Sequence, residues 1–222
     1  MTDDIRVLLV DDQSMLRLGF RMVLSAEEGI EVVGEAGDGA AGFAMTKALQ
    51  PDVVLMDVRM PGVDGIEATR RIVAEAPGAR VIILTTFDLD EYAFAALRAG
   101  ASGFLLKDAR PDELASAIRA VAAGDAAVAP RVTRRMLELF AERLPDAAVT
   151  PASDERLDAL TPREHEIFAA LGEGLSNAEI AARFVLSEAT VKTHVARVLG
   201  KLGLRDRVQA VVLAYETGVV GR

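Results

Sequence analysis

The first 123 residues alternate between two hydrophobic patterns. Short apolar runs predict buried strands at residues 5–10, 30–34, 52–56, 81–84 and 103–106. Each run is followed by a stretch with helical periodicity, at about 14–25, 39–49, 64–75, 89–99 and 111–123. Strands that are apolar throughout and alternate with helices are typical of a parallel sheet covered on both faces. The pattern therefore predicts a doubly wound α/β domain with a five-stranded parallel sheet.

The pattern changes at about residue 124. Residues 131–144 are typical of one amphipathic helix, because Val132, Met136, Phe140 and Leu144 recur at a spacing of four. Residues 145–154 contain two prolines among small and polar residues, with no periodicity, and this favours a flexible connection. We therefore expect a first domain at 1–123, a linker with its own helix at 124–158 and a second domain at 159–222.

The last 64 residues carry the start signals of four helices and no strand pattern. Thr161-Pro-Arg-Glu164 and Ser176-Asn-Ala-Glu179 are capping boxes, in which a hydroxyl and a glutamate satisfy free N–H groups. Ser187 is expected to cap a third helix at about 188–202, and Asp206 a fourth that ends near Gly218. This segment is predicted to be a small all-α domain.

Composition excludes several classes of protein. Hydrophobic residues make up 51% of the chain and charged residues 27%, which fits a folded chain rather than a disordered one. The absence of cysteine excludes disulfides, thiol nucleophiles and cysteine-ligated metals, and only two histidines are present. No apolar run reaches the roughly 18 residues of a membrane helix, and the acidic start is unlike a signal peptide. We expect a soluble, cytoplasmic protein with no membrane partner.

The net charge of −9 conceals a difference between the two domains. Residues 1–123 hold 20 acidic and 12 basic side chains, a net charge of −8. Residues 159–222 hold 7 acidic and 8 basic side chains, a net charge of +1, and the linker carries the remaining −2. The pooled charge argues against nucleic-acid binding, but the second domain by itself does not.

Five polar residues follow or end the predicted strands of the first domain: Asp11, Asp12, Asp57, Thr85 and Lys107. In a doubly wound sheet the carboxyl ends of the strands form the ligand-binding edge. Three carboxylates gathered there repel one another, and a hard cation such as Mg²⁺ would relieve the repulsion. With Mg²⁺ and the lysine shielding an incoming phosphate, one carboxylate could act as a nucleophile and become an aspartyl phosphate.

These residues stand within motifs that resemble the receiver domain of two-component response regulators. The resemblance covers residues 5–123, and the motifs are Val7-Leu-Leu-Val-Asp-Asp12, Asp52-Val-Val-Leu-Met-Asp57-Val-Arg-Met-Pro-Gly62, Ile83-Leu-Thr85-Thr and Gly100-Ala-Ser-Gly-Phe-Leu-Leu-Lys107. The resemblance implies a flavodoxin-like fold, a bound Mg²⁺ and a sensor histidine kinase as the phosphoryl donor. It also implies that the domain catalyses only its own phosphorylation and dephosphorylation, so the chain is not expected to be an enzyme in the usual sense.

The resemblance implies a role for each matching position. Asp57 is the phospho-acceptor. Asp12 binds Mg²⁺ directly, Asp11 contacts it through water, and the backbone carbonyl of Arg59 completes the protein ligands. Thr85 and Lys107 hold the phosphoryl oxygens, and Phe104 is the aromatic switch residue whose rotamer follows Thr85. Arg59 and Phe87 occupy positions that tune dephosphorylation.

Other phosphate-binding chemistries fit this domain less well. Gly37-Asp-Gly39-Ala-Ala-Gly42 matches a dinucleotide-binding fingerprint, but it follows the second strand and leaves Asp11 and Lys107 without a role. An Asp-x-Asp phosphatase would need a second aspartate where Gln13 stands, and no P-loop sequence is present. A nucleotide-binding enzyme built on the glycine motif remains the alternative, which binding of a nicotinamide cofactor would support.

The predicted helix at 188–202 has one apolar and one basic face. The apolar stripe is formed by Val191, Val195, Val198, Leu199 and Leu202. The opposite face carries Lys192, Thr193, Ala196, Arg197, Gly200 and Lys201. Basic and small residues on an exposed helix suit close approach to the major groove. His194 is interpreted as a packing or phosphate-contacting residue rather than a metal ligand.

A preceding helix at 177–184 and a tight turn at 185–187 complete a helix-turn-helix. Ser187, at the start of the recognition helix, could offer an N–H group to a phosphate. Arg205 and Arg207 flank the next helix and are candidates for phosphate contacts. Basic side chains on a helix can also be simply solvated, and the alternative function is a protein-interaction module in which the four helices bind a partner rather than DNA.

The second domain resembles the LuxR-type helix-turn-helix. The resemblance rests on Leu160-Thr-Pro-Arg-Glu-His-Glu-Ile167, Gly174-Leu-Ser-Asn-Ala-Glu-Ile-Ala181 and Ser187-Glu-Ala-Thr-Val-Lys-Thr-His-Val195. It implies that Lys192, Thr193 and Ala196 face the base edges of duplex DNA. It also implies dimerisation through the last helix, for which the candidates are Val208, Val211, Val212 and Tyr215.

A receiver followed by a LuxR-type domain is similar to the NarL/FixJ class of response regulators. That resemblance implies a transcription regulator that is phosphorylated on Asp57 by a sensor histidine kinase. Phosphorylation is then expected to pull Thr85 and Phe104 inward, to favour a homodimer and to allow binding to promoter DNA.

Overall fold

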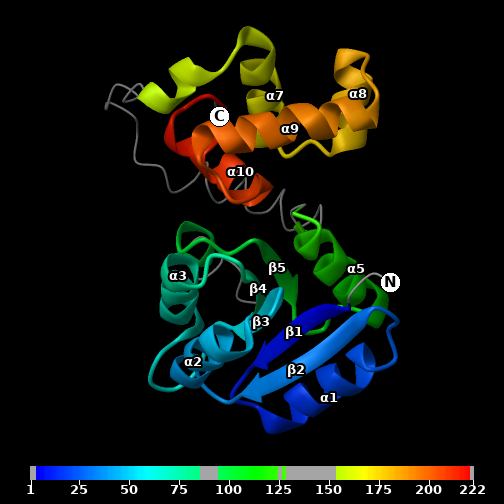
Figure 1. Ribbon diagram of the computed structural model, residues 1–222, viewed down its shortest axis with the longest axis vertical. Coiled ribbons are helices and arrows are strands. Elements are labelled where there is room, and N and C mark those ends of the chain that lie inside the picture. Colours follow the sequence, from blue (N-terminus) through cyan, green and yellow to red (C-terminus); the bar gives the residue numbers. More distant parts are fainter. Residues whose placement is uncertain (1–3, 86–94, 125–126, 129–153, 221–222) are drawn as a thin grey trace. The chain divides into compact units, whose positions relative to one another are not determined.

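The computed structural model describes residues 4–85, 95–124, 127–128 and 154–220. The chain divides into two compact units, Met1–Val132 and Thr133–Arg222. Figure 1 shows an α/β unit, coloured blue to green, and an all-helical unit, coloured yellow to red. The helix predicted at 131–144 lies outside the described residues. No helix in the described parts of the chain is long and apolar enough to cross a membrane.

The first unit is built on a parallel sheet with the strand order β2-β1-β3-β4-β5-β6. The strands are β1 (Ile5–Val10), β2 (Ile30–Ala36), β3 (Val53–Asp57), β4 (Arg80–Thr85), β5 (Gly103–Leu106) and β6 (Ala127–Val128). The five predicted strands are confirmed. The sixth lies in the segment interpreted as linker, and a strand of two residues is too short to show a hydrophobic period.

Helices cover both faces of this sheet, as predicted for apolar strands. They are α1 (Ser14–Leu24), α2 (Gly39–Leu49), α3 (Gly65–Glu75) and α5 (Pro111–Ala122). Figure 1 shows α1 and α5 on one face and α2 and α3 on the other. The helix predicted at 89–99 is described only from residue 95, and residues 95–98 are helical.

The two faces of β1 follow the alternation of its side chains. Val7 and Leu9 are buried in the cluster that α1 and α5 complete. Val10 points to the other face, where Gly42 of α2 lies so close that an added Cβ would be 2.7 Å from Val10 Cγ1. The absence of a side chain at Gly42 therefore allows α2 to lie directly against the sheet.

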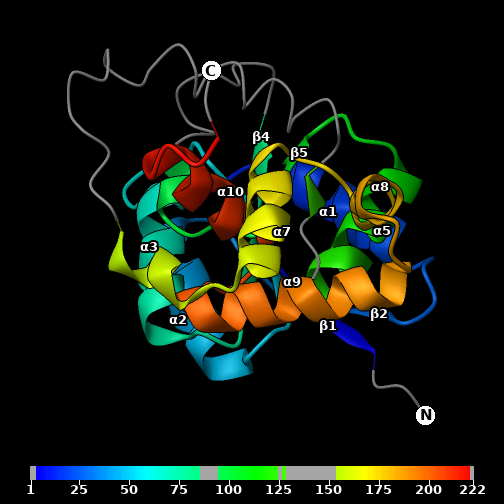
Figure 2. The ribbon, with the colours of Figure 1, turned by 90° about the horizontal axis from the view of Figure 1, so that it is seen from above.

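The second unit is all-helical, as predicted. It contains η1 (Glu155–Ala159), α7 (Pro162–Gly172), α8 (Asn177–Phe184), α9 (Glu188–Leu202) and α10 (Arg207–Glu216). Every predicted cap is confirmed, because the side chains of Thr161, Ser176, Ser187 and Asp206 each accept a hydrogen bond from the backbone N–H three residues later. Figure 2 shows α9, the longest of these helices, running across α7.

One face of α9 closes the core of this unit. Val191, Val198 and Leu202 are fully buried with Phe168 of α7, and Val195 and Leu199 are partly buried beside them. The apolar stripe predicted for this helix is therefore confirmed. Since this stripe fixes the rotation of α9 about its own axis, it also decides which side chains of the helix face solvent.

Candidate functional site

The carboxyl ends of four strands bring the predicted acidic residues to one edge of the sheet. Asp11 follows β1, Asp57 and Thr85 are the last residues of β3 and β4, and Lys107 follows β5. The parallel register keeps these ends level, since Val10 pairs with Met56 and Asp57 with Leu84. The backbone N–H of Lys107 also donates to the Thr85 carbonyl at 2.7 Å. Residues far apart in sequence therefore meet, as the strand pattern predicted.

Asp11, Asp12 and Asp57 form a carboxylate cluster. One oxygen from each lies within 4.8 Å of the others, close enough for one cation to contact all three. Asp11 and Asp57 are buried, with 2% and 4% of their surface exposed, whereas Asp12 is exposed. Two of the three carboxylates are thus removed from water, which makes their mutual repulsion strong.

Lys107 lies between the two buried carboxylates. Its Nζ is 2.7 Å from Asp11 Oδ2 and 2.9 Å from Asp57 Oδ2, and its side chain is 8% exposed. Burial acts to lower the pKa of Lys107, but the hydrogen bonds and charges of the two aspartates outweigh it and raise that pKa. Burial raises the pKa of Asp57, although the hydrogen bond from Lys107 opposes this. One ammonium therefore serves two carboxylates and does not fully compensate either.

The oxygen atoms of the carboxylate cluster are suitable ligands for a hard divalent cation. Three carboxylates against one ammonium leave an excess of negative charge, and oxygen is the ligand that Mg²⁺ prefers. The main chain of Arg59 lies at the same place, because its N–H points to Asp57 Oδ1 at 3.4 Å. Asp11, Asp12 and Asp57 are therefore compatible with Mg²⁺, and the backbone of Arg59, whose carbonyl completes the predicted ligand set, lies beside Asp57.

The two predicted switch residues are both buried. Thr85 is 7% exposed at the end of β4, and Phe104, in β5, is wholly buried opposite Ile83. Phe104 thus lies inside the domain in this structure. Phe87, which was expected to tune dephosphorylation, lies outside the described residues.

Packing accounts for the glycine motif that suggested a dinucleotide site. The Gly39 N–H donates to the Val63 carbonyl at 3.2 Å, and a Cβ on Gly39 would lie 2.4 Å from that oxygen. Asp38 caps α2 through the N–H of Ala41, and Gly42 packs against Val10. These contacts give Gly39, Gly42 and Asp38 structural roles, because they allow the close approach of α2 to its neighbours and cap its first turn.

One residue beside the carboxylate cluster was not predicted from the sequence. Arg17, one turn into α1, donates from Nη1 to the backbone carbonyl of Asp11. Its spacing in α1 signals only a polar position on a helix. A signal could have come from the helix geometry, because a long side chain near a helix start points back toward the preceding loop.

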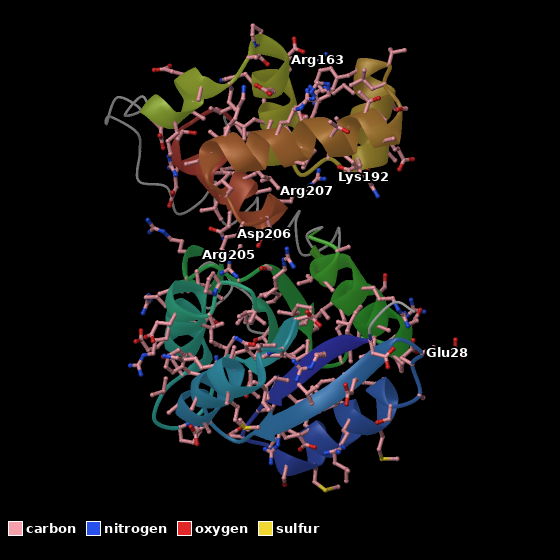
Figure 3. All side chains as sticks on the ribbon, viewed as in Figure 1. Glu28, Arg163, Lys192, Arg205, Asp206 and Arg207 are labelled. Atoms are coloured by element: carbon pink, nitrogen blue, oxygen red, sulfur yellow. The ribbon has the colours of Figure 1, made fainter. Side chains whose placement is uncertain are left out.

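In the second unit, the predicted basic face of α9 is partly confirmed. Lys192, Thr193, Ala196 and Arg197 are exposed, and Figure 3 shows Lys192 extending from the edge of α9. A shallow depression lies on this helix, lined by Ala189, Thr190, Thr193, His194 and Arg197. Thr193 and Ala196 are small and lie between Lys192 and Arg197, which leaves room for the close approach of a DNA groove.

Three further residues of the predicted DNA interface have other contacts. Lys201 is exposed as well, but its Nζ binds Glu164 Oε2 at 2.6 Å and the Ala159 carbonyl at 3.0 Å. Ser187 uses its hydroxyl to cap α9. Arg205 is half-buried, and Figure 3 shows it with Asp206 and Arg207 at the start of α10.

The contact of Lys201 predicts a pH dependence. The hydrogen bond from Lys201, followed by that from the Thr161 N–H, lowers the pKa of Glu164 from 4.5 to about 2. The ionised carboxylate therefore stabilises the fold fully above pH 4.5, and this contribution is lost as the pH falls through that range toward 2. We expect Glu164→Gln to be less stable than wild type at pH 7, with a gap that narrows on acidification in urea unfolding followed by circular dichroism.

The control for this prediction is Glu166→Gln, which breaks an exposed pair with Arg163 on the same helix. The difference in free energy of unfolding between Glu166→Gln and wild type should be small and the same from pH 7 to pH 3. A gap between wild type and Glu164→Gln that is the same at both pH values would contradict the assignment.

Comparison with known proteins agrees with this geometry in both units. Residues 7–119 match the response regulator receiver domain, and residues 158–214 match the family described as bacterial regulatory proteins, luxR family. YxjL of Bacillus subtilis, described as an uncharacterized transcriptional regulatory protein, is 46% identical over 218 residues, which cover 98% of each chain.

Two solved structures are similar over nearly the whole chain. The response regulator ChrA of a heme-sensing two-component system is 39% identical, with a TM-score of 0.54, and 98% of this chain and 99% of ChrA are covered. A structure of two RcsB dimers bound to two parallel DNAs is 25% identical, with a TM-score of 0.57 and coverage of 98% and 100%.

Proposed function

The chain belongs to the two-component response regulators of the NarL/FixJ class, and we propose that phosphorylation of Asp57 controls its binding to promoter DNA. The proposal rests on the presence of two different sites in one chain. A buried carboxylate pocket with a shared lysine stands at the sheet edge of one unit, and an exposed basic helix face stands on the other. We place the protein in the cytoplasm, where a sensor histidine kinase and promoter DNA would both reach it.

The phosphoryl donor is proposed to be a phosphohistidine of that kinase. A carboxylate oxygen of Asp57 attacks phosphorus, the P–N bond breaks, and the electron pair of that bond leaves with the histidine nitrogen. Lys107, already 2.9 Å from Asp57 Oδ2, would move its ammonium onto a phosphoryl oxygen, and the Thr85 hydroxyl would hold another. When bound by Asp11, Asp12, Asp57 and the Arg59 carbonyl, Mg²⁺ supplies charge neutralisation for the incoming phosphoryl group.

The reaction stays within the receiver. The domain would transfer the phosphoryl group to itself and later to water, without an external substrate other than the donor. We therefore propose a phosphorylated regulator and not an enzyme in the usual sense. Thr85 and Phe104 would convert the new charge into a change of surface, since both are buried in neighbouring strands, β4 and β5, whose carboxyl ends carry the site.

Dimerisation is proposed to involve α10. Its residues Ala210, Leu213 and Ala214 belong to the core of the helical unit. Of the four residues expected to take part in dimerisation, Val208 and Val212 are buried, with 3% and 6% of their surface exposed. Val211 and Tyr215 are only partly buried and lie one turn apart on the helix, so these two are the α10 side chains proposed to contact a second copy. RcsB, a similar protein, is described as dimers bound to DNA. Two linked helical units would bind two half-sites with higher avidity than one.

The proposal can be tested by treating the full chain with acetyl phosphate and Mg²⁺. The probe is a duplex recovered from random DNA by repeated selection with the wild-type chain. We expect wild type to gain one phosphoryl group in its intact mass, to sediment as a dimer and to bind the duplex at least about 10-fold more tightly. Asp57→Ala should show none of these changes.

The matched control is Asp112→Ala, which removes an exposed carboxylate in the first turn of α5. It should respond to acetyl phosphate as wild type does. Equal dimerisation and DNA binding by treated wild type and Asp57→Ala would overturn the switching mechanism. Failure to enrich any duplex would overturn the DNA-binding function and favour a protein partner for the helical unit.

A further inference from the structure

We propose that Arg17, held by Glu35, is a positioning residue that fixes the Asp11–Asp12 segment in the shape that a divalent cation needs. This inference rests on the proposed function of the acidic pocket. Neither residue contributes an oxygen to the carboxylate cluster itself. Their effect would pass through the main chain of Asp11.

Arg17 joins three elements around the pocket. Its Nη1 donates to the Asp11 carbonyl, and its Nε lies 3.4 Å from Glu35 Oε2 near the end of β2. The side chain is only 18% exposed, and a Cβ on Gly37 would lie 3.8 Å from its Nη1. The guanidinium is therefore held in a half-buried position between α1, the end of β1 and the turn after β2.

Four hydrogen-bonding groups of Asp11 are then fixed from four directions. Its N–H donates to the Ala36 carbonyl at 3.1 Å, and its Oδ1 accepts the Gln13 N–H at 2.8 Å. Its Oδ2 is paired with Lys107, and its carbonyl accepts from Arg17. Two of these four partners are side chains. Lys107 lies within the carboxylate cluster and contacts Asp57 as well, whereas Arg17 reaches Asp11 from outside the cluster.

The carbonyl of Asp11 controls the placement of Asp12. The carbonyl and the next N–H lie in one planar peptide unit, so fixing the oxygen fixes the plane from which the Asp12 Cα departs. Asp12 is the exposed member of the cluster. Holding this peptide plane would therefore reduce the number of orientations that the Asp12 carboxylate loses when a cation binds.

The charge of Glu35 makes this arrangement compatible with a cation site. An unpaired guanidinium beside three carboxylates would compete with a divalent cation for them. Glu35 lies 3.4 Å from Arg17 Nε and also pairs with Arg21 Nη1 at 2.7 Å, so it compensates part of the positive charge of Arg17 on the side away from the carboxylate cluster. Arg17 can thus orient the pocket without occupying it. Partners of metal ligands commonly act in this way.

The test uses the full chain and Mg²⁺ alone as the probe. Binding is measured by titration calorimetry, and the rate of phosphorylation by acetyl phosphate is measured as a function of Mg²⁺ concentration. We expect Arg17→Ala to weaken Mg²⁺ binding about 10-fold, the lower end of the effect of such partners. The Mg²⁺ concentration for half-maximal rate should rise by the same factor, with little change of the rate at saturation.

Two further variants separate positioning from folding. Arg17→Gln keeps an N–H donor for the Asp11 carbonyl and should recover part of the Mg²⁺ affinity, which also covers the case that Arg17→Ala does not fold. Arg21→Ala removes the other partner of Glu35, on the same helix, and should leave Mg²⁺ affinity within about twofold of wild type, as for an exposed ion pair.

The outcomes distinguish this inference from the function on which it rests. If wild type binds Mg²⁺ and Arg17→Ala binds it equally well, or if Arg21→Ala loses as much affinity, Arg17 is a structural residue only and the inference is overturned. If Arg17→Gln folds and binds no better than a folded Arg17→Ala, the carbonyl contact is not the cause. If wild type itself binds no Mg²⁺ and accepts no phosphoryl group, the proposed function fails first.

Discussion

Replacing Lys107 with methionine is expected to lower the free energy of unfolding by about 3 kcal/mol and to slow phosphorylation of Asp57 by about 10²–10³-fold. The stability is lost because two buried carboxylates, Asp11 and Asp57, would remain without their shared counter-ion. The rate is lost because the ammonium that would stabilise charge on the phosphoryl oxygens is missing. Urea unfolding and mass spectrometry after treatment with acetyl phosphate measure the two effects.

Adding Mg²⁺ should separate the effect of Lys107→Met on stability from its effect on the rate of phosphorylation. A divalent cation neutralises the carboxylates whether or not the lysine is present, so millimolar Mg²⁺ should restore much of the stability of Lys107→Met. It should not restore the rate, because the lysine acts on a different oxygen of the phosphoryl group. Equal rates in wild type and Lys107→Met at saturating Mg²⁺ would contradict the role given to this lysine.

Lys47→Met provides the control for the loss of one lysine charge. Lys47 Nζ lies 2.8 Å from Glu75 Oε2, and both side chains are about half exposed. An exposed pair of this kind contributes at most about 1 kcal/mol. Both the stability and the phosphorylation of Lys47→Met should therefore be close to those of wild type.

The second large effect is expected in DNA binding. Replacing both Lys192 and Arg197 with alanine should weaken binding to the selected duplex by about 100-fold or more, because each contact is worth about 1–3 kcal/mol. Both side chains are exposed on α9, and Arg197 lines the depression on that helix. If both contact phosphates, the slope of log affinity against log salt should fall by about 1.8 per protomer.

The control removes a cation elsewhere in the same unit. Arg156→Ala breaks a pair with Asp154 at 2.6 Å in η1, outside the predicted interface, and should leave affinity and salt slope close to wild type. Circular dichroism should show the native helix content for every variant. Equal loss of affinity in Arg156→Ala and in the double variant would indicate a general charge effect rather than contact through α9.

The acidic pocket could be predicted from sequence because its members occupy one kind of position. Asp11, Asp57, Thr85 and Lys107 each stand at or just after the end of an apolar strand, and parallel strands bring such ends together. The caps of the helical unit were equally accessible, because a capping box is a contact between residues three apart. Both predictions use rules that need only the local chain or the direction of the strands.

Lys201 shows where such rules stop. It shares the basic face of its helix with Lys192 and Arg197, and the helical period gives it the same predicted role. In the structure its ammonium has further contacts, with Glu164 of α7 and with the end of η1. The hydrophobic period of α9 could not predict this contact, because Glu164 lies 37 residues away in the sequence.

The sequence by itself determined the strand and helix order, the strand ends that carry the acidic residues, and the helix caps. These depend on hydrophobic period and on hydrogen bonds between near neighbours, which are local properties of the chain. Only the tertiary structure decided that Lys107 is shared by two carboxylates, that Arg17 reaches the Asp11 carbonyl, and that Lys201 is turned toward Glu164. Long flexible side chains can reach several partners, and the packing of distant elements selects one of them.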